Sequence, residues 1–524
     1  MKPPSYRAAA STGCPLATHA ALSILSRGGN AVDAAIAATA VLFVTMPMSC
    51  GPGGDLVCLV YDREAGRVLG LTALGHAPSG ATIARFHGLG HSRIPVTGLL
   101  SSTTPVGLQA LQQLNRRFSA LSLERLFSDA ISLAHDGFEI SNQFNRWTTN
   151  NISVVTLSDE LAALYAPQGV AREPGSRLRQ VNLGRTLELF AANPSEYRPT
   201  EPMVRGLLEL SRTLGEYFTE TDMSPKYDET VLQRAIGGGN LHTSPLPTQG
   251  ILLLNNFTAL LEALPADMSE TEAHRIHLAC EIYNQTYHKR RRFAGDPEFV
   301  NSSNNLLMRS SVEDILRHIN PHVRTPCLYN GFYSGGDTTH LVVGDENGNG
   351  ASIITSLSLG FGSGLPIPGT GVILNNRLGR SAVLDESDPN GLAPGKRPVN
   401  TIHNYALTDE AGLVAIGGTP GGDGQVQWNA QVLEAVVRRG MDAERAIRLP
   451  RFTYYPGGDL AEADMPESIH VENVERESVV RLRARGYDVR RKSRVQGALR
   501  MLRRVSAGWN VLDDQHEDGL STGF

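Results

Sequence analysis

The stretch "SGGDTTHLVV", residues 334–343, sets two threonines between a glycine-rich run and an apolar segment. The apolar residues that follow predict a strand beginning near Thr338. Thr338 is then either simply the first residue of that strand or the new N-terminus of a chain that cuts itself. The two readings differ in whether the Thr338 hydroxyl acts as a nucleophile.

Strand, turn and strand recur in three places along the chain. Residues 339–357 read as two apolar runs around the turn "GDENGNG", and residues 55–74 and 404–418 show the same pattern. Asn and Gly in the turns and apolar residues in the arms are typical of hairpins. The pattern therefore predicts β-structure near both ends of the chain.

Helices are predicted between and before these strands. Residues 17–27 form one helix that ends at a Gly-Gly pair, and Asn30 caps a second, Ala-rich helix over 31–44. A long, mostly helical region covers about 105–320, and residues 317–337 resemble an exposed connector in which a cut is tolerated. Strands at both ends with helices between them predict one layered α+β domain.

Composition excludes several classes of function. The chain has 524 residues, a formal net charge of -5 and 41% hydrophobic residues, which gives no reason to expect a nucleic-acid partner. Five scattered cysteines without CxxC spacing argue against a disulfide framework and a zinc site. Residues 31–48 are too short and too polar at Asp33 for a comfortable membrane span, and no secretion signal is evident. We expect a cytoplasmic protein without membrane partner, metal or cofactor.

Two glycine-rich loops could carry chemistry. The segment "IGGTPGGDGQVQWNAQVLEAVV", residues 416–437, leads from a strand into a helix, so the amides of Gly421 and Gly422 could form an oxyanion hole. The loop "GPGGD", residues 51–55, is a second candidate. A plain turn is the alternative for both loops, since neither contains the Gly-Lys-Ser/Thr of a phosphate site.

The motifs taken together resemble one known family. "GGNAVDAAIAATAVLFV", "GPGGD", "GGDTTH", "GFGSG", "ILNN", "APGKRP" and "TPGGDGQ" occur in the order and approximate spacing of the γ-glutamyltranspeptidase family, over about residues 7–520. The resemblance implies an N-terminal-nucleophile hydrolase with a four-layer αββα sandwich and a mostly helical insertion in its large subunit. It also implies a precursor cut between Asp337 and Thr338, giving a heterodimer of a large subunit, 1–337, and a small subunit, 338–524.

The resemblance also implies roles for single residues. Thr338 matches the nucleophile, whose free α-amine, with a pKa near 7.7–8.0 in model compounds, serves as the general base. Gly421 and Gly422 match the oxyanion-hole pair, while Thr339 and Ser356 match hydroxyls beside the nucleophile. Residues matching the family's substrate-binding pair are Asn400 and Thr401.

Four positions depart from the family pattern. Leu74 stands where the family has an arginine that binds the α-carboxylate of glutamate, and Ser358 replaces an asparagine near the α-amine. Arg377 and Arg380 replace the acceptors that hold that amine. Because a cation repels an ammonium group, we expect a small-molecule substrate that is not a γ-glutamyl donor but anionic or keto-acid-like. Structural ion pairs are the alternative for one or both arginines.

Three functions remain open at this point. The departures favour amide or carbon–carbon bond hydrolysis in specialised metabolism, similar to homologues of antibiotic alkylproline pathways. A conventional γ-glutamyl hydrolase or transferase is one alternative. An unprocessed, inactive binding or structural homologue is another.

Overall fold

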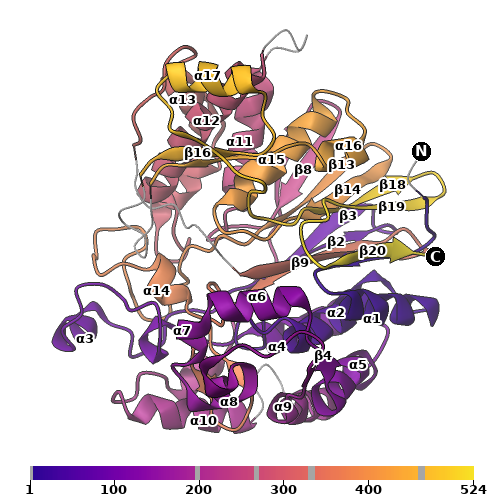
Figure 1. The fold of residues 1–524 in the computed structure, drawn as a ribbon, viewed down its shortest axis with the longest axis vertical. Helices are drawn as coiled ribbons and strands as arrows, with labels where there is room; N and C mark the ends of the chain where they lie inside the picture. The colour runs from indigo at the N-terminus through magenta and orange to yellow at the C-terminus, as the bar shows by residue number, and fades with distance from the viewer. Residues whose placement is uncertain (1–3, 195–200, 265–270, 329–336, 458–465) are drawn as a thin grey trace.

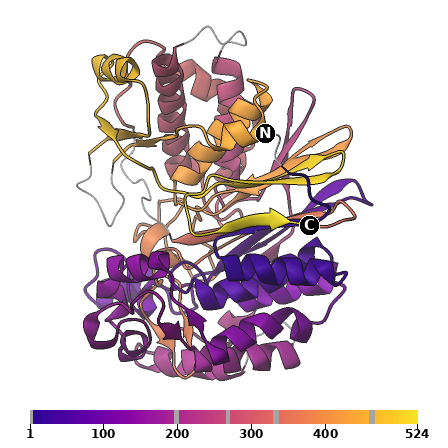
Figure 2. The same cartoon turned by 45° about the vertical axis from the view of Figure 1, so that its right-hand side comes forward.

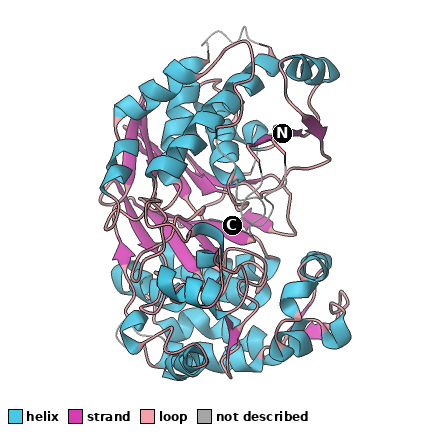
Figure 3. Cartoon of the chain, turned by 90° about the vertical axis from the view of Figure 1, so that its left-hand side faces the viewer, coloured by secondary structure: helices cyan, strands magenta, loops and turns pink. Residues whose placement is uncertain are grey.

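The computed structural model describes residues 4–194, 201–264, 271–328, 337–457 and 466–524. Two sheets lie face to face in the middle of the molecule, and helices cover the outer face of each sheet (Figures 1–3). The four-layer αββα sandwich expected from the resemblance is thus confirmed. Of the connector expected over 317–337, residues 329–336 lie outside the described residues.

The first sheet has seven strands, and every neighbouring pair is antiparallel. Its central strands are the two hairpins predicted over 55–74 and 339–357, lying side by side. In spatial order the strands are β20 (Leu520–Gly523), β1 (Ala9–Thr12), β9 (Thr338–Gly344), β10 (Gly350–Ser356), β2 (Asp55–Asp62), β3 (Arg67–Ala73) and β6 (Tyr227–Asp228). Segments before and after the expected cut therefore alternate in one sheet.

The second sheet has six strands and combines the same two parts of the chain. In spatial order they are β19 (Gly508–Asp513), β18 (Arg500–Val505), β14 (Gly412–Gly418), β13 (Asn404–Asp409), β8 (Gly239–Thr243) and β7 (Leu232–Ile236). The middle region is mostly helical as expected, and the hairpin β7–β8 is a β-structure within it that the sequence analysis did not predict. Its turn is the Gly-Gly pair at 237–238, and two glycines between two short arms are a hairpin signal at sequence level.

Helices of the N-terminal half cover the first sheet (Figure 2). Helix α2 (Ala31–Thr45) is buried along its whole length, because its alanines allow close packing on all sides. Asn30 caps it as predicted: its side chain accepts hydrogen bonds from the amides of Val32 and Asp33 at 2.9 Å. The other main helices of this layer are α1 (Pro15–Ser26), α4 (Gly107–Phe118), α5 (Leu123–Asp136), α9 (Val181–Ala192) and α10 (Glu201–Arg212).

A second helical layer covers the other sheet at the top of Figure 1. It contains α11 (Gly250–Ala263), α12 (Glu272–Phe293), α13 (Arg309–His318), α15 (Gly424–Val437), α16 (Ala443–Ile447) and α17 (Arg476–Ala484). The short strands β15 (Phe452–Tyr455), β16 (Ser468–Val471) and β17 (Val489–Arg491) form a small sheet beside these helices. No helix within the described ranges has the length and apolar character needed to cross a bilayer.

Each pair of layers encloses its own apolar core. The large clusters lie between a sheet and its helices, and a smaller cluster including Val342, Ile416 and Trp509 lies between the sheets. Alternation along β9 follows from this arrangement: Leu341 and Val343 belong to the cluster beneath the first helical layer, while Val342 faces the second sheet. Thr338 shares the face of Val342, so its side chain points between the sheets.

Candidate active site

Three polar residues form one row across the first sheet. Ser356 of β10 lies directly opposite Thr338 of β9 on one side and directly opposite Asp55 of β2 on the other. Residues that are directly opposite share a face of the sheet and have Cβ atoms about 4.5–5.5 Å apart. The row Thr338–Ser356–Asp55 is therefore on the face between the two sheets, at the ends of the strands.

Hydrogen bonds join Thr338 to the peptide bond that precedes it. The Thr338 hydroxyl donates to Ser356 Oγ at 2.9 Å, and the Ser356 hydroxyl donates to the carbonyl oxygen of Asp337 at 3.2 Å. The backbone amide of Ser358 donates to Ser356 Oγ at 2.9 Å and fixes this hydroxyl in place. One hydroxyl thus contacts both the candidate nucleophile and the carbonyl that it would attack.

Ser358 lies beside this chain in an unusual conformation. Its φ is 88°, in the left-handed region that non-glycine residues rarely adopt, and its side chain is buried. Its hydroxyl has no hydrogen-bond partner within the described part of the chain. Strained, unsatisfied groups of this kind concentrate at functional sites.

The side chain of Asp337 lies in a charged environment next to the same peptide bond. Burial raises its pKa to about 6, and nearby Glu517 adds to the rise, while Arg380 and a hydrogen bond with Asn151 oppose it. Glu517 is itself paired with Arg500 at 2.7 Å. The positive charge of Arg380 thus stabilises the ionised form of Asp337, the residue on the N-terminal side of the expected cut.

Asp55 organises the other end of the row. Its carboxylate is fully buried and accepts hydrogen bonds from the Gly75 amide at 2.8 Å, from Asn400 Nδ2 at 2.7 Å and from Arg377 Nε at 3.1 Å. These partners come from the segment after β3, from the loop before β13 and from helix α14 (Arg377–Ser381). One carboxylate therefore holds three segments that were expected to bind substrate.

Leu74 and Arg377 take different positions in this arrangement. Leu74 packs in a small apolar cluster with Val57, Ile354 and Ile402 between the sheets. Arg377 is 2% exposed and forms an ion pair with Asp55, so the structural alternative applies to this arginine. The position at which the resemblance implies a carboxylate-binding arginine is therefore occupied by a side chain in an apolar cluster.

Asn400 and Thr401 are both buried close to this centre. The Asn400 amide group is engaged at both ends: its Nδ2 donates to Asp55, and its Oδ1 accepts from the Ile402 backbone at 3.2 Å. Asn400 therefore positions the loop and the carboxylate in this structure.

Gly421 and Gly422 form the loop between β14 and α15. Their φ values, 123° and 58°, lie in the left-handed region that favours glycine, and a Cβ on Gly421 would collide with the ring of Trp428. The strand that leads into this loop faces β9, because a Cβ on Gly418 would lie 2.9 Å from Nε2 of His340. Gly418, at the end of the strand before this loop, therefore packs against His340, which is two positions after Thr338 in the sequence.

Thr339 lies on the opposite face of β9 from Thr338. Its hydroxyl contacts Sδ of Met46 at 3.7 Å, beneath the first helical layer. The structure therefore does not group Thr339 with the hydroxyls of Thr338 and Ser356. Side chains alternate along a strand, so two adjacent threonines cannot both face the reacting centre.

Sequence reasoning missed the role of Asp55, although it singled out the loop "GPGGD" that ends at this residue. An acidic residue at the start of an otherwise apolar strand is the available signal, because a buried carboxylate requires partners. The partner Arg377 lies 322 positions further along the chain. Sequence spacing alone does not pair these residues.

Comparison with known proteins identifies the family of this chain. The Gamma-glutamyltranspeptidase family model matches residues 17–524, and the chain belongs to this family.

Three known proteins illustrate the similarity. The oxamate amidohydrolase proenzyme of Klebsiella pneumoniae is 30% identical over 448 residues, covering 83% of each chain. The crystal structure of a cephalosporin acylase from Bacillus halodurans superimposes with a TM-score of 0.88 at 25% identity, covering 99% of this chain and 96% of the acylase. The structure named LmbA2991HD has a TM-score of 0.83 at 25% identity and covers 100% and 99%. The chain is thus similar to hydrolases made as proenzymes.

Proposed function

We propose that this protein is a self-processing hydrolase whose nucleophile is Thr338. The observation that carries the proposal is the hydrogen-bond chain from the Thr338 hydroxyl through Ser356 to the Asp337 carbonyl oxygen. In the self-cleavage step, Thr338 Oγ1 attacks the carbonyl carbon of Asp337. The carbon–nitrogen bond then breaks, the nitrogen takes up a proton, and an ester joins Asp337 to the Thr338 side chain. Water hydrolyses the ester to a free Asp337 carboxylate and a free Thr338 hydroxyl.

The same hydroxyl then serves the mature enzyme. The new α-amine of Thr338 has an ordinary pKa near 8, so a substantial fraction is neutral and able to accept the hydroxyl proton. Attack on a substrate carbonyl gives an acyl ester on Thr338, which water hydrolyses. Amides of Gly421 and Gly422 supply hydrogen bonds to the oxyanion, a contribution of about 3–4 kcal/mol for each donor.

We further propose a substrate with an anionic or keto-acid-like acyl group. Leu74 lies in a hydrocarbon cluster and Asp55 forms an ion pair with Arg377, whereas the charge of Arg380 acts on Asp337, so we assign the carboxylate contact to Arg380. The electrostatic effect of Arg380 on Asp337 supports this choice, because the acyl group of the substrate replaces Asp337 at Thr338. Oxamate, named for the Klebsiella relative, is an anion of this class. An amide and a carbon–carbon bond beside a keto acid both offer the electrophilic carbonyl that the mechanism needs.

Gel electrophoresis tests the cleavage. Sharing the 56.5 kDa mass in proportion to the lengths of 1–337 and 338–524 gives bands of about 36 and 20 kDa. We expect both bands for the purified protein and for Thr338→Ser, and one full-length band for Thr338→Ala. A wild-type chain that stays intact under the same conditions would refute self-cleavage.

Mass spectrometry tests the substrate class. The mature protein is incubated with oxamate, with a keto-acid amide and with a γ-glutamyl anilide, and the small subunit is examined for an added acyl mass on Thr338. We expect the acyl ester from the anionic donors, and Arg380→Gln should weaken their turnover by about 10²-fold or more, whereas Arg380→Lys should lose less. Efficient turnover of the γ-glutamyl anilide would instead establish the conventional activity.

A further inference from the structure

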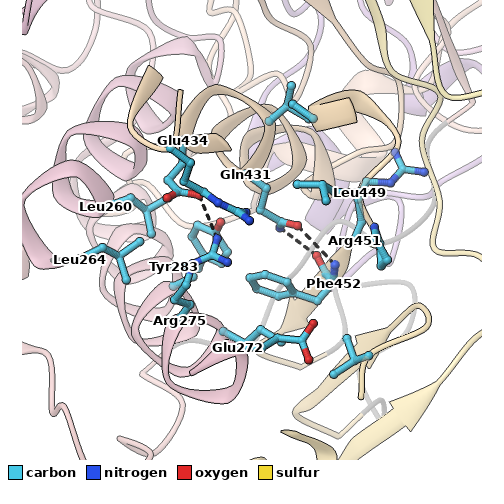
Figure 4. Close-up of a pocket in the computed structure, with 17 residues that line it drawn as sticks. Leu260, Leu264, Glu272, Arg275, Tyr283, Gln431, Glu434, Leu449, Arg451 and Phe452 are labelled. Carbon is cyan, nitrogen blue, oxygen red and sulfur yellow. Dashed lines mark hydrogen bonds and ion pairs between the residues drawn. The ribbon is translucent and has the colours of Figure 1, made fainter. Parts of the chain in front are cut away.

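A cavity separate from the Thr338 site lies in the second helical layer (Figure 4). It is enclosed by α11, α12 and α15 and by the segment that runs from α16 into β15, and its volume is about 130 Å³. Much of its lining is apolar: Leu260, Leu264, Ile276, Ala279, Leu449 and Val474. A cavity of about 150 Å³ accommodates benzene, so this one suits a compact apolar body.

An aromatic wall closes one side of the cavity. The side-chain amide of Gln431 donates to the carbonyl of Phe452 at 2.9 Å and accepts from the amide of Phe452 at 3.3 Å. Figure 4 shows this pair and the Phe452 ring beside Tyr283, and the two ring centroids are 6.3 Å apart in a stacked arrangement. Phe452 is thus held by its backbone while its ring lines the cavity.

Two guanidinium groups and one carboxylate line another side of the cavity. Arg275 Nη2 lies 2.9 Å from Glu434 Oε2, and Arg439 also lines the cavity. Nε of Arg275 and Nε of Arg439 are both buried and have no hydrogen-bond partner among the described residues. Buried N–H donors are almost always satisfied in native proteins, so these two groups call for an acceptor.

The surrounding charges disfavour the cationic form of Arg439. Burial and the proximity of Arg275 lower the pKa of Arg439, and Glu434 only partly offsets them. Arg451, a third arginine in the lining, is paired with Asp514 at 3.0 Å. Glu272 accepts the Glu475 amide at 3.3 Å. Glu434 is thus paired with Arg275 and acts on Arg439 only through its electrostatic field.

We propose that this cavity binds a small organic monoanion: a carboxylate held by Arg439 and Arg275, attached to a compact apolar body that packs against the leucines and Phe452. An inorganic anion would satisfy the guanidinium groups but would leave the apolar lining empty. The inference is independent of the function proposed for Thr338, because no residue of the row Thr338–Ser356–Asp55 lines the cavity.

Benzoate is a suitable probe, and benzamide is its neutral counterpart of nearly the same shape. Calorimetric titration is carried out on Thr338→Ala, so that turnover does not complicate the measurement. We expect saturable benzoate binding, with benzamide at least about tenfold weaker because it lacks the charge. Arg439→Met should weaken benzoate binding by a similar factor while leaving benzamide binding nearly unchanged.

The matched control is Arg125→Gln on the exposed surface of α5, which should bind benzoate like the parent. A crystal soaked with para-bromobenzoate then locates the bromine by anomalous scattering and separates this cavity from the Thr338 site. Absence of bromine from the cavity would overturn the proposal. Equal affinity for benzoate and benzamide, or equal competition by chloride, would also overturn it, since the site would then be merely apolar or merely ionic.

Discussion

The two ends of the row Thr338–Ser356–Asp55 are held by different forces. At the Thr338 end, neutral hydroxyls donate and accept hydrogen bonds around the scissile carbonyl. At the Asp55 end, a fully buried carboxylate is bound to an arginine that is itself 2% exposed. Neutral hydroxyls can redirect their protons during a reaction, whereas a buried ion pair keeps its partners in one geometry. The reacting end thus suits proton movement, and the Asp55 end suits the fixed shape of a binding pocket.

Breaking the ion pair is expected to have the largest effect on stability. Asp55→Asn removes the charge that faces Arg377 Nε at 3.1 Å in a buried ion pair, which should lower the free energy of unfolding by about 3–5 kcal/mol, measured by urea denaturation. Adding Arg377→Met to this variant should recover much of the loss, because the buried guanidinium charge is removed together with its carboxylate.

Asp62→Asn at the other end of β2 is the matched control for that change. Asp62 is partly exposed and accepts one turn hydrogen bond, from the Ala65 amide at 3.0 Å, so we expect a loss of about 1 kcal/mol. If Asp55→Asn lowered the free energy of unfolding no more than this control, the ion pair between Asp55 and Arg377 would not be a major source of stability.

Removing the Ser356 hydroxyl should affect the reaction more than the fold. Ser356→Ala deletes the donor to the Asp337 carbonyl, and we expect self-cleavage to slow by about 10²–10³-fold, followed as band intensity over time. Ser356→Thr keeps the hydroxyl and should cleave at a rate near that of the parent.

Ser311→Ala controls for the loss of a buried serine hydroxyl. Ser311 is buried in α13, and its hydroxyl has no partner within the described ranges. This variant should cleave normally. Equal rates for Ser356→Ala and Ser311→Ala would remove Ser356 from the mechanism.

The uncut protein should become less stable as the pH rises through the titration of Asp337. Its pKa is raised from 3.8 to about 6, so the folded state binds a proton more tightly than the unfolded state does. The stabilisation is complete below pH 3.8 and is lost as the pH rises through about 6, by at most about 3 kcal/mol. Urea midpoints of Thr338→Ala between pH 4 and 7 measure this change. Asp337→Asn in the same background should remove it, and an unchanged profile would contradict the burial of a neutral Asp337.

The smallest effect is expected at Thr339. Thr339→Val keeps the shape of the side chain and loses only a weak contact with Met46. We expect self-cleavage within about threefold of the parent and a stability change below about 1 kcal/mol. A loss of cleavage comparable to that of Ser356→Ala would show that Thr339 takes part in the reaction despite lying on the other face of β9.

Much of the fold follows from local patterns. The cap at Asn30, the hairpins around 55–74 and 339–357, and the glycine loop before α15 depend on neighbouring residues, and the structure has all of them. The hairpin β7–β8 was not predicted, because its strands are too short to show a clear alternation of apolar and polar residues. Its glycine-rich turn is equally typical of a loop between helices.

The sequence patterns were enough to predict a layered α+β domain with a threonine at the start of a strand, and the resemblance to a known family implied the αββα fold. Only the tertiary structure shows that Thr338, Ser356 and Asp55 share a row, that Thr339 faces away, and that Arg377 is neutralised. The physical reason is register: β2 and β10 come from segments some 300 positions apart, and their pairing decides which side chains meet. Local propensity forms each strand, but the packing of strands from distant segments decides which charged side chains meet.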